Sequence, residues 1–206
     1  MNRILASQLR RPHGWFGSLV VSRVMNRINR KITVTTLDLL DIDPDQHVLE
    51  IGFGGGIGID ELLRRVPQGA VSGVDISTTA LSKAQRRFRK QVDGGRLRLQ
   101  LGDVCQLPFP DHTFDRVLTI NTIYFWPDTA KGMREIYRVL KPGGAAAVSI
   151  RSGEKMRQHG VTKYNFTLFS GEDVSRIMQQ SGFKNVRVDH RDQEHWYDQV
   201  IVLGTR

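Results

Sequence analysis

The 206-residue sequence has a single cysteine, Cys105, and no long apolar run. One cysteine excludes an internal disulfide and a multi-cysteine metal site, so we expect a cytoplasmic protein with no bound metal. The apolar runs are a few residues long, far below the ~20 residues that span a bilayer. We expect no transmembrane segment, and the apolar stretch 19–21 is too short for a secretory signal.

Acidic residues are absent from the first 37 positions, which carry six arginines and one lysine. The whole chain has a net charge of +9, so most of its basicity belongs to this segment. Its apolar residues also recur at intervals of four, which predicts one apolar stripe on a helix. The residues of this stripe are Phe16, Val20, Val24 and Ile28.

We therefore expect a basic helical arm over residues 1–36 and a single catalytic domain over residues 37–206. Three interpretations of the arm stay open: it docks on the domain, it covers a pocket as a lid, or it contacts a membrane surface. Its charge would also suit an anionic partner such as nucleic acid.

Beyond the arm, short apolar runs alternate with amphipathic stretches. The runs predict strands at 47–51, 70–75, 96–101, 114–120 and 145–150. The stretches between them predict helices at 57–65, 78–91 and 128–140. This alternation predicts a parallel sheet with right-handed crossovers.

The end of the chain has a different pattern. Ser170 to Asp173 forms a capping-box pattern that predicts a helix to about Ser181. Two strand-like segments follow, at 184–190 and 196–203, and predict an antiparallel hairpin at one edge. The expected fold is α/β: a doubly wound, mostly parallel seven-stranded sheet with a C-terminal antiparallel hairpin and an N-terminal helical arm.

A glycine-rich turn follows the first predicted strand, with five glycines between positions 52 and 58. Such a turn lets a ligand approach the backbone, and the following helix N-terminus favours a carboxylate. The turn does not match the glycine pattern of nicotinamide- and flavin-binding proteins, because Ile57 or Ile59 occupies the position of the third glycine. A P-loop fails too, because no lysine occurs between Lys31 and Lys83.

What remains is an acid-x-Gly-x-Gly-x-Gly pattern made by Glu50, Gly52, Gly54 and Gly56. On this pattern the chain resembles the class I S-adenosylmethionine (SAM)-dependent methyltransferases. Asp75 strengthens the resemblance, because it closes the second predicted strand 21 residues after Gly54. A carboxylate at that place can accept hydrogen bonds from both hydroxyls of a ribose.

Three later motifs extend the resemblance over about residues 45–150. They are Gly102-Asp103-Val104, the segment from Leu107 through Asp111 to Asp115, and Arg138 to Gly144. Their order and spacing resemble the ubiquinone/menaquinone-biosynthesis type of small-molecule methyltransferase.

The resemblance implies SAM as the cofactor and assigns residues to it. The assigned residues are Glu50, Gly52, Gly54, Gly56, Asp75, Ile76, Asp103, Val104, Asn121 and Thr122. In this arrangement the glycines border the methionyl part and Asp75 holds the ribose. Ile76 packs on the adenine, whose edge Asp103 and Val104 recognise. Asn121 and Thr122 close the floor under the reacting centre.

Methyl transfer from a sulfonium needs alignment more than acid–base chemistry, and a base matters only when the acceptor must lose a proton. We expect a small aromatic or apolar acceptor. Tyr124 and His159 are the catalytic candidates, with His159 as the base, and Trp126 and Tyr164 are the acceptor-binding candidates. Two alternatives stay open: an RNA methyltransferase that uses the basic arm, and a non-catalytic module that binds SAM or S-adenosylhomocysteine (SAH).

Overall fold

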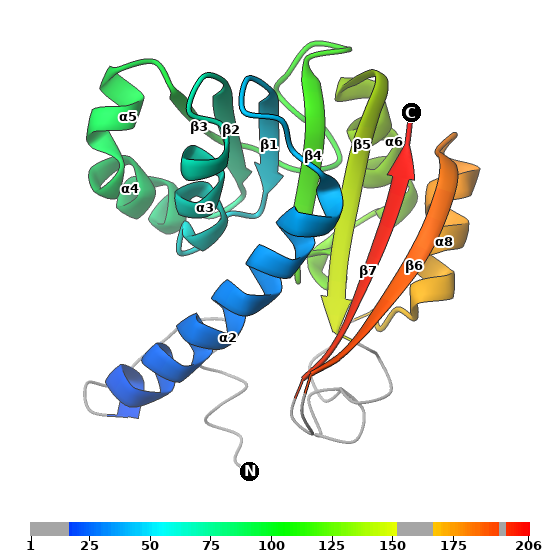
Figure 1. Ribbon diagram of the computed structural model, residues 1–206, viewed down its shortest axis with the longest axis horizontal. Helices are drawn as coiled ribbons and strands as arrows, with labels where there is room; N and C mark the ends of the chain where they lie inside the picture. The colour runs from blue at the N-terminus through cyan, green and yellow to red at the C-terminus, as the bar shows by residue number, and fades with distance from the viewer. Residues whose placement is uncertain (1–16, 152–166, 194–196) are drawn as a thin grey trace.

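The computed structural model describes residues 17–151, 167–193 and 197–206. Its sheet has seven strands in the order β3-β2-β1-β4-β5-β7-β6 (Figure 1). The strands are β1 (His47–Ile51), β2 (Ala70–Asp75), β3 (Leu97–Leu101), β4 (Phe114–Ile120), β5 (Leu140–Arg151), β6 (Lys184–Gln193) and β7 (Tyr197–Thr205). β7 runs antiparallel to both of its neighbours, β5 and β6, whereas β1 to β5 pair in parallel. The expected α/β sheet with its C-terminal antiparallel hairpin is confirmed.

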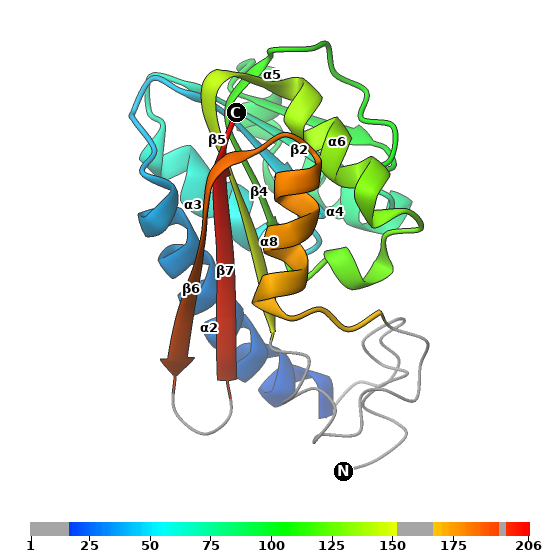
Figure 2. The ribbon, with the colours of Figure 1, turned by 90° about the vertical axis from the view of Figure 1, so that its right-hand side faces the viewer.

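Helices cover both faces of this sheet. They are α2 (Gly17–Leu40), α3 (Ile57–Arg65), α4 (Thr78–Arg87), α5 (Arg89–Asp93), the 3₁₀ turn η1 (Ile123–Phe125), α6 (Thr129–Val139) and α8 (Gly171–Gln180). Figure 2 shows α2 and α3 on one face and α6 and α8 on the other. Leu37, Leu62 and Phe88 share one buried apolar cluster, while Met133 and Met178 belong to the other. A double layer of this kind buries both faces of the strands, as parallel sheets require.

The predicted helix over 78–91 is wrong in one respect, because the structure breaks it into α4 and α5 at Phe88. Phe88 leaves the helical conformation, with φ −107° and ψ 24°, and its side chain is buried. The ring lies against the glycine-rich turn, since a Cβ on Gly56 would come within 2.7 Å of it. Burial of this ring therefore accounts for the break, which no local pattern in the sequence indicates.

The expected boundary between residues 36 and 37 falls inside α2, which continues to Leu40. The C-terminal part of this helix belongs to the core: Ile32, Leu37 and Leu40 are buried. The Gln199 side-chain amide on β7 donates to the Ile32 carbonyl and to the Thr36 hydroxyl, each at 3.1 Å. The N-terminal part of α2 extends past the sheet in Figure 1. Residues 1–16 lie outside the described residues, and the lid role of the arm stays a prediction.

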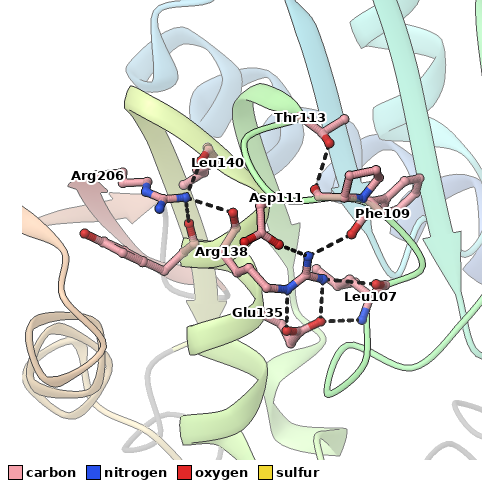
Figure 3. Close-up of polar contacts among 10 residues, drawn as sticks. Leu107, Phe109, Asp111, Thr113, Glu135, Arg138, Leu140 and Arg206 are labelled. Atoms are coloured by element: carbon pink, nitrogen blue, oxygen red, sulfur yellow. Dashed lines mark hydrogen bonds and ion pairs between the residues drawn. The ribbon is translucent and has the colours of Figure 1, made fainter.

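The side chain of Arg138 connects two of the sequence motifs, the segment from Leu107 to Asp115 and the segment from Arg138 to Gly144 (Figure 3). Its guanidinium bonds the carboxylates of Glu135 and Asp111 at 2.7 Å and the Phe109 carbonyl at 2.8 Å. These ion pairs raise the pKa of Arg138 and lower the pKa values of Glu135 and Asp111. Arg206 donates in turn to the Leu140 carbonyl at 2.6 Å.

This network supports the fold at the edge opposite the glycine-rich turn. Asp111 precedes β4 and Arg138 precedes β5, so both lie near the amino ends of these strands. At the same edge Lys141 donates to the Asp115 carboxylate at 2.8 Å, and the His47 N–H donates to it at 2.9 Å. These contacts join the starts of β1, β4 and β5, so the two motifs are structural.

Candidate cofactor site and active site

The glycine-rich turn leaves β1 in a conformation that few residues other than glycine adopt. Gly52, Gly54 and Gly56 have φ values of 74°, 46° and 74°. The Gly52 N–H donates to the Val74 carbonyl at 2.7 Å, which ties the turn to β2. A Cβ on Gly54 or Gly55 would meet nothing within 4 Å. One side of the turn is therefore open to a ligand.

Asp75 ends β2 beside this turn and is buried. One carboxylate oxygen accepts the Gly54 N–H at 2.8 Å, and the other accepts the Ser77 N–H at 2.9 Å. The structure thus brings together two of the predicted site residues, Asp75 and Gly54, which lie 21 positions apart in the sequence. The contact between Asp75 and Gly54 arises because adjacent parallel strands end at the same edge of a sheet.

Glu50 is buried at the end of β1, under the N-terminus of α3. Burial raises the pKa of its carboxyl to about 8, and the nearby charge of Asp75 adds to the rise, while a hydrogen bond from the Ile59 N–H opposes it. Oxygen Oε2 has no hydrogen-bond partner among the described residues. An unpaired carboxylate oxygen beside a second acid suits a positively charged ligand group.

Two apolar side chains stand exposed at the carboxyl ends of β2 and β3. Ile76 is 73% exposed and Leu101 is 49% exposed. Leu101 pairs in register with Asp75, so the two apolar residues flank the same corner of the sheet. Ile76 is among the residues predicted from the sequence, whereas Leu101 is not, although it directly precedes the Gly102-Asp103 motif.

Asp103 and Val104 follow β3 at the same corner. The Asp103 carboxylate accepts the Cys105 N–H at 2.8 Å, which holds the loop in a tight turn. Val104 is buried and packs in the apolar cluster under α6. Of this predicted pair, only Asp103 therefore presents a polar side chain at the corner, because the Val104 side chain belongs to the core.

Thr122 lies directly beneath the glycine-rich turn. A Cβ on Gly52 would come within 2.4 Å of its methyl group, which explains the glycine at that position. Its hydroxyl bonds the Thr119 hydroxyl and accepts the Trp126 indole N–H at 3.1 Å. Asn121, with φ 57°, turns the chain out of β4. Of the two residues predicted as a floor, Thr122 thus contacts the turn after β1, and the Asn121 N–H donates to the Ser149 carbonyl on β5 at 2.9 Å.

Three consecutive aromatic residues follow, and they have different surroundings. Tyr124 is buried, and its hydroxyl accepts the Arg151 N–H at 2.5 Å. Trp126 packs on α6, where a Cβ on Gly132 would come within 2.9 Å of the indole. Phe125 is 60% exposed and was not selected from the sequence, because nothing local distinguishes it from its neighbours. The catalytic role of Tyr124 and the acceptor-binding role of Trp126 stay predictions.

His159 and Tyr164 lie between residues 152 and 166, outside the described residues. This segment follows Arg151 at the carboxyl end of β5, the same edge as the glycine-rich turn. Within the described ranges, no group of three or more histidine, cysteine, aspartate or glutamate side chains is placed to hold a metal ion. None of the described helices is both long enough and apolar enough to cross a bilayer.

Comparisons with known proteins agree with this geometry. A family model described as "Methyltransferase domain" matches residues 49–148. An uncharacterized methyltransferase, YdaC, of Bacillus subtilis is 28% identical over 174 residues, which cover 84% of this chain and 91% of that protein. The 2-methyl-6-phytyl-1,4-hydroquinone methyltransferase 1 of rice (Oryza sativa subsp. japonica) is 37% identical over 165 residues. That match covers 76% of this chain and 48% of the rice protein, so the chain spans about half of this relative.

Solved structures share the fold. Phosphoethanolamine N-methyltransferase 2 of Haemonchus contortus, determined in complex with SAM, superposes with a TM-score of 0.72. The match covers 84% of this chain and 52% of that chain at 21% identity.

Proposed function

The chain belongs to the class I SAM-dependent methyltransferases, and we propose that it methylates a small aromatic or apolar metabolite. The observation that carries this proposal is the arrangement at the carboxyl edge of the sheet. An open glycine-rich turn lies beside two buried acids, Glu50 and Asp75, and two exposed apolar side chains, Ile76 and Leu101, lie at the ends of β2 and β3.

The residues at this edge fit the three parts of SAM. Asp75 would accept hydrogen bonds from the ribose, as its position at the end of β2 allows. The exposed side chains of Ile76 and Leu101 would pack on the adenine, and Asp103 would accept a hydrogen bond at its edge. The open side of the turn would take the amino-acid end, whose ammonium group suits the unpaired oxygen of Glu50.

Bound SAM supplies an electrophilic methyl group, so the protein's task is to align the acceptor and exclude water. Alignment of two reactants is worth ~7–11 kcal/mol in favourable cases. The residues after β4 would provide this alignment, a role that the position of η1 directly after Thr122 supports. Phe125 offers an exposed aromatic surface beside the buried Tyr124 and would form an acceptor wall.

An aromatic acceptor such as a phenol or hydroquinone loses a proton during methylation, which calls for a base. His159 is the candidate, because its segment follows β5 at the same edge. The rice relative is named for a hydroquinone substrate, which supports this class of acceptor.

The test is a product assay with SAM carrying a deuterated methyl group. The purified protein is incubated separately with a hydroquinone and simple phenols, with small amines including phosphoethanolamine, and with total RNA. Mass spectrometry then follows the label. Labelled phenol or hydroquinone ethers or ring-methylated products support the proposal.

Other outcomes decide against it. Label found only in amines overturns the aromatic class of acceptor, and label found only in RNA favours a nucleic-acid substrate. Binding of SAH with no turnover on any acceptor would favour the non-catalytic module.

A further inference from the structure

Arg87, the last residue of α4, lies across the glycine-rich turn. Its guanidinium donates to the Gly55 carbonyl at 2.9 Å. The side chain is 48% exposed, and its guanidinium carbon lies 4.8 Å from the centroid of the Phe88 ring. No sequence motif indicates this contact, because 32 positions separate the two residues.

The contact completes the support of the turn. Asp75 accepts the Gly54 N–H, and Arg87 donates to the carbonyl of the following residue, Gly55. Phe88 closes the same side, since a Cβ on Gly56 would come within 2.7 Å of its ring. The break between α4 and α5 thus sets two consecutive side chains, Arg87 and Phe88, against the turn.

Arg87 is also oriented by a neighbouring carboxylate. One of its nitrogens lies 3.8 Å from the Asp60 carboxylate on α3. Asp60 in turn bonds Arg64 at 2.5 Å, and Arg64 lies 3.0 Å from Glu61, which pairs with Arg30 on α2. This chain of charges links α2, α3 and α4 and lies beside the guanidinium at the turn.

We propose that Arg87 is a positioning residue for the amino-acid half of SAM. It holds the Gly55 peptide so that the open face of the turn keeps the shape that this half requires. The proposal rests on the cofactor arrangement given above, in which the adenosine half contacts Asp75 and the amino-acid half contacts the turn.

The test compares two ligands by calorimetric titration. SAH carries the amino-acid half, whereas 5′-methylthioadenosine lacks it and keeps the adenosine. The variants are Arg87→Gln, Arg87→Lys and the control Arg86→Gln. Arg86 precedes Arg87 on the same helix, is exposed, and makes no hydrogen bond or ion pair with the residues that the structure describes.

Arg87→Gln is expected to weaken SAH binding by about 5- to 10-fold, the scale of one half-exposed charge-assisted hydrogen bond. Its affinity for 5′-methylthioadenosine should change by less than about twofold, because the lost contact is remote from the adenosine half. Arg87→Lys should restore part of the SAH affinity, and Arg86→Gln should match the wild type.

The deciding quantity is the ratio of the Kd for SAH to the Kd for 5′-methylthioadenosine within each variant. Partial unfolding lowers both affinities equally and leaves this ratio unchanged. An unchanged ratio in Arg87→Gln and Arg87→Lys would overturn the proposal. Asp75→Ala separates this failure from a failure of the cofactor arrangement: if that variant binds both ligands like the wild type, the arrangement itself is wrong.

Discussion

Gly58 lies directly over the carboxylate of Glu50, so close that a Cβ at this position would come within 2.1 Å of Oε1. Gly58 is the second residue of α3, and Glu50 is the next-to-last residue of the strand beneath it. The missing side chain therefore makes the space in which a buried acid reaches the cofactor edge. Two glycines of the same segment, Gly58 and Gly55, consequently have different tasks.

Gly58→Ala should destabilise the protein, although alanine normally favours a helix by ~1 kcal/mol over glycine. The added methyl group must displace the Glu50 side chain or α3, and overpacking of this kind costs roughly 1–3 kcal/mol. Urea unfolding of the ligand-free protein measures the change. A gain in stability would contradict the contact.

Gly55→Ala should have the opposite effect: it should leave stability almost unchanged and weaken SAH binding. Its Cβ would meet nothing within 4 Å, and its backbone does not have a positive φ, so stability should change by less than about 0.5 kcal/mol. The methyl group would however occupy the open face of the turn, and we expect SAH affinity to fall at least tenfold by titration calorimetry. Unchanged affinity would mean that the ligand does not approach this face.

Glu50→Gln tests the buried acid through pH. The folded protein raises the pKa of Glu50 from 4.5 to about 8, so the folded state binds this proton more tightly than the unfolded state does. Stability should therefore fall as the pH rises from about 4.5 to about 8, and the loss should be complete above that range. In the variant this dependence should disappear.

Thermal unfolding at pH 5.5, 7 and 8.5 measures the effect. At pH 8.5 the ligand-free variant should melt about 2–4 °C higher than the wild type, the shift that ~1 kcal/mol produces in a domain of this size. The same variant should bind SAM more weakly, because a neutral amide lacks the negative charge that strengthens a hydrogen bond from the ligand's ammonium group. Equal pH profiles of the two proteins would show that Glu50 does not titrate in this range.

Arg138→Met should affect stability without affecting the cofactor site. The substitution removes the guanidinium donor from two carboxylates and two carbonyls, and we expect a loss of roughly 1–3 kcal/mol in urea unfolding. SAH affinity should stay within about twofold, because Arg138 lies at the amino end of β5. Arg176→Gln is the control, since its exposed pair with Asp173 is worth little. A large loss of SAH affinity in Arg138→Met would assign the motif a role in binding.

Phe125→Ala tests the proposed acceptor wall. SAH binding should be unchanged, while kcat/KM for the acceptor should fall about 10-fold or more, because burial of an aromatic surface and acceptor alignment are both lost. Steady-state kinetics with the acceptor found in the product assay gives the value, and Phe125→Leu should retain part of it. An unchanged kcat/KM would remove Phe125 from the acceptor site.

The sequence by itself determined the order and type of the elements and the character of the site. Apolar runs placed β1, β2 and β4 at their observed bounds. The spacing of the glycines excluded the nicotinamide and flavin fingerprint, and the lack of a lysine excluded a P-loop. These inferences succeeded because the tendency to form a strand and the conformation of a turn depend largely on residues that are close in the sequence. The meeting of Asp75 with Gly54 followed from topology alone, since parallel strands end at one edge.

Only the tertiary structure decided which side chains meet across that edge. The register of β2 and β3 set Leu101 beside Asp75, and the burial of Phe88 broke a helix and brought Arg87 to Gly55. Packing also seated Trp126 on α6. Such contacts depend on the distance between elements and on the side chains that compete for the same space, and neither is encoded in a local pattern of residues.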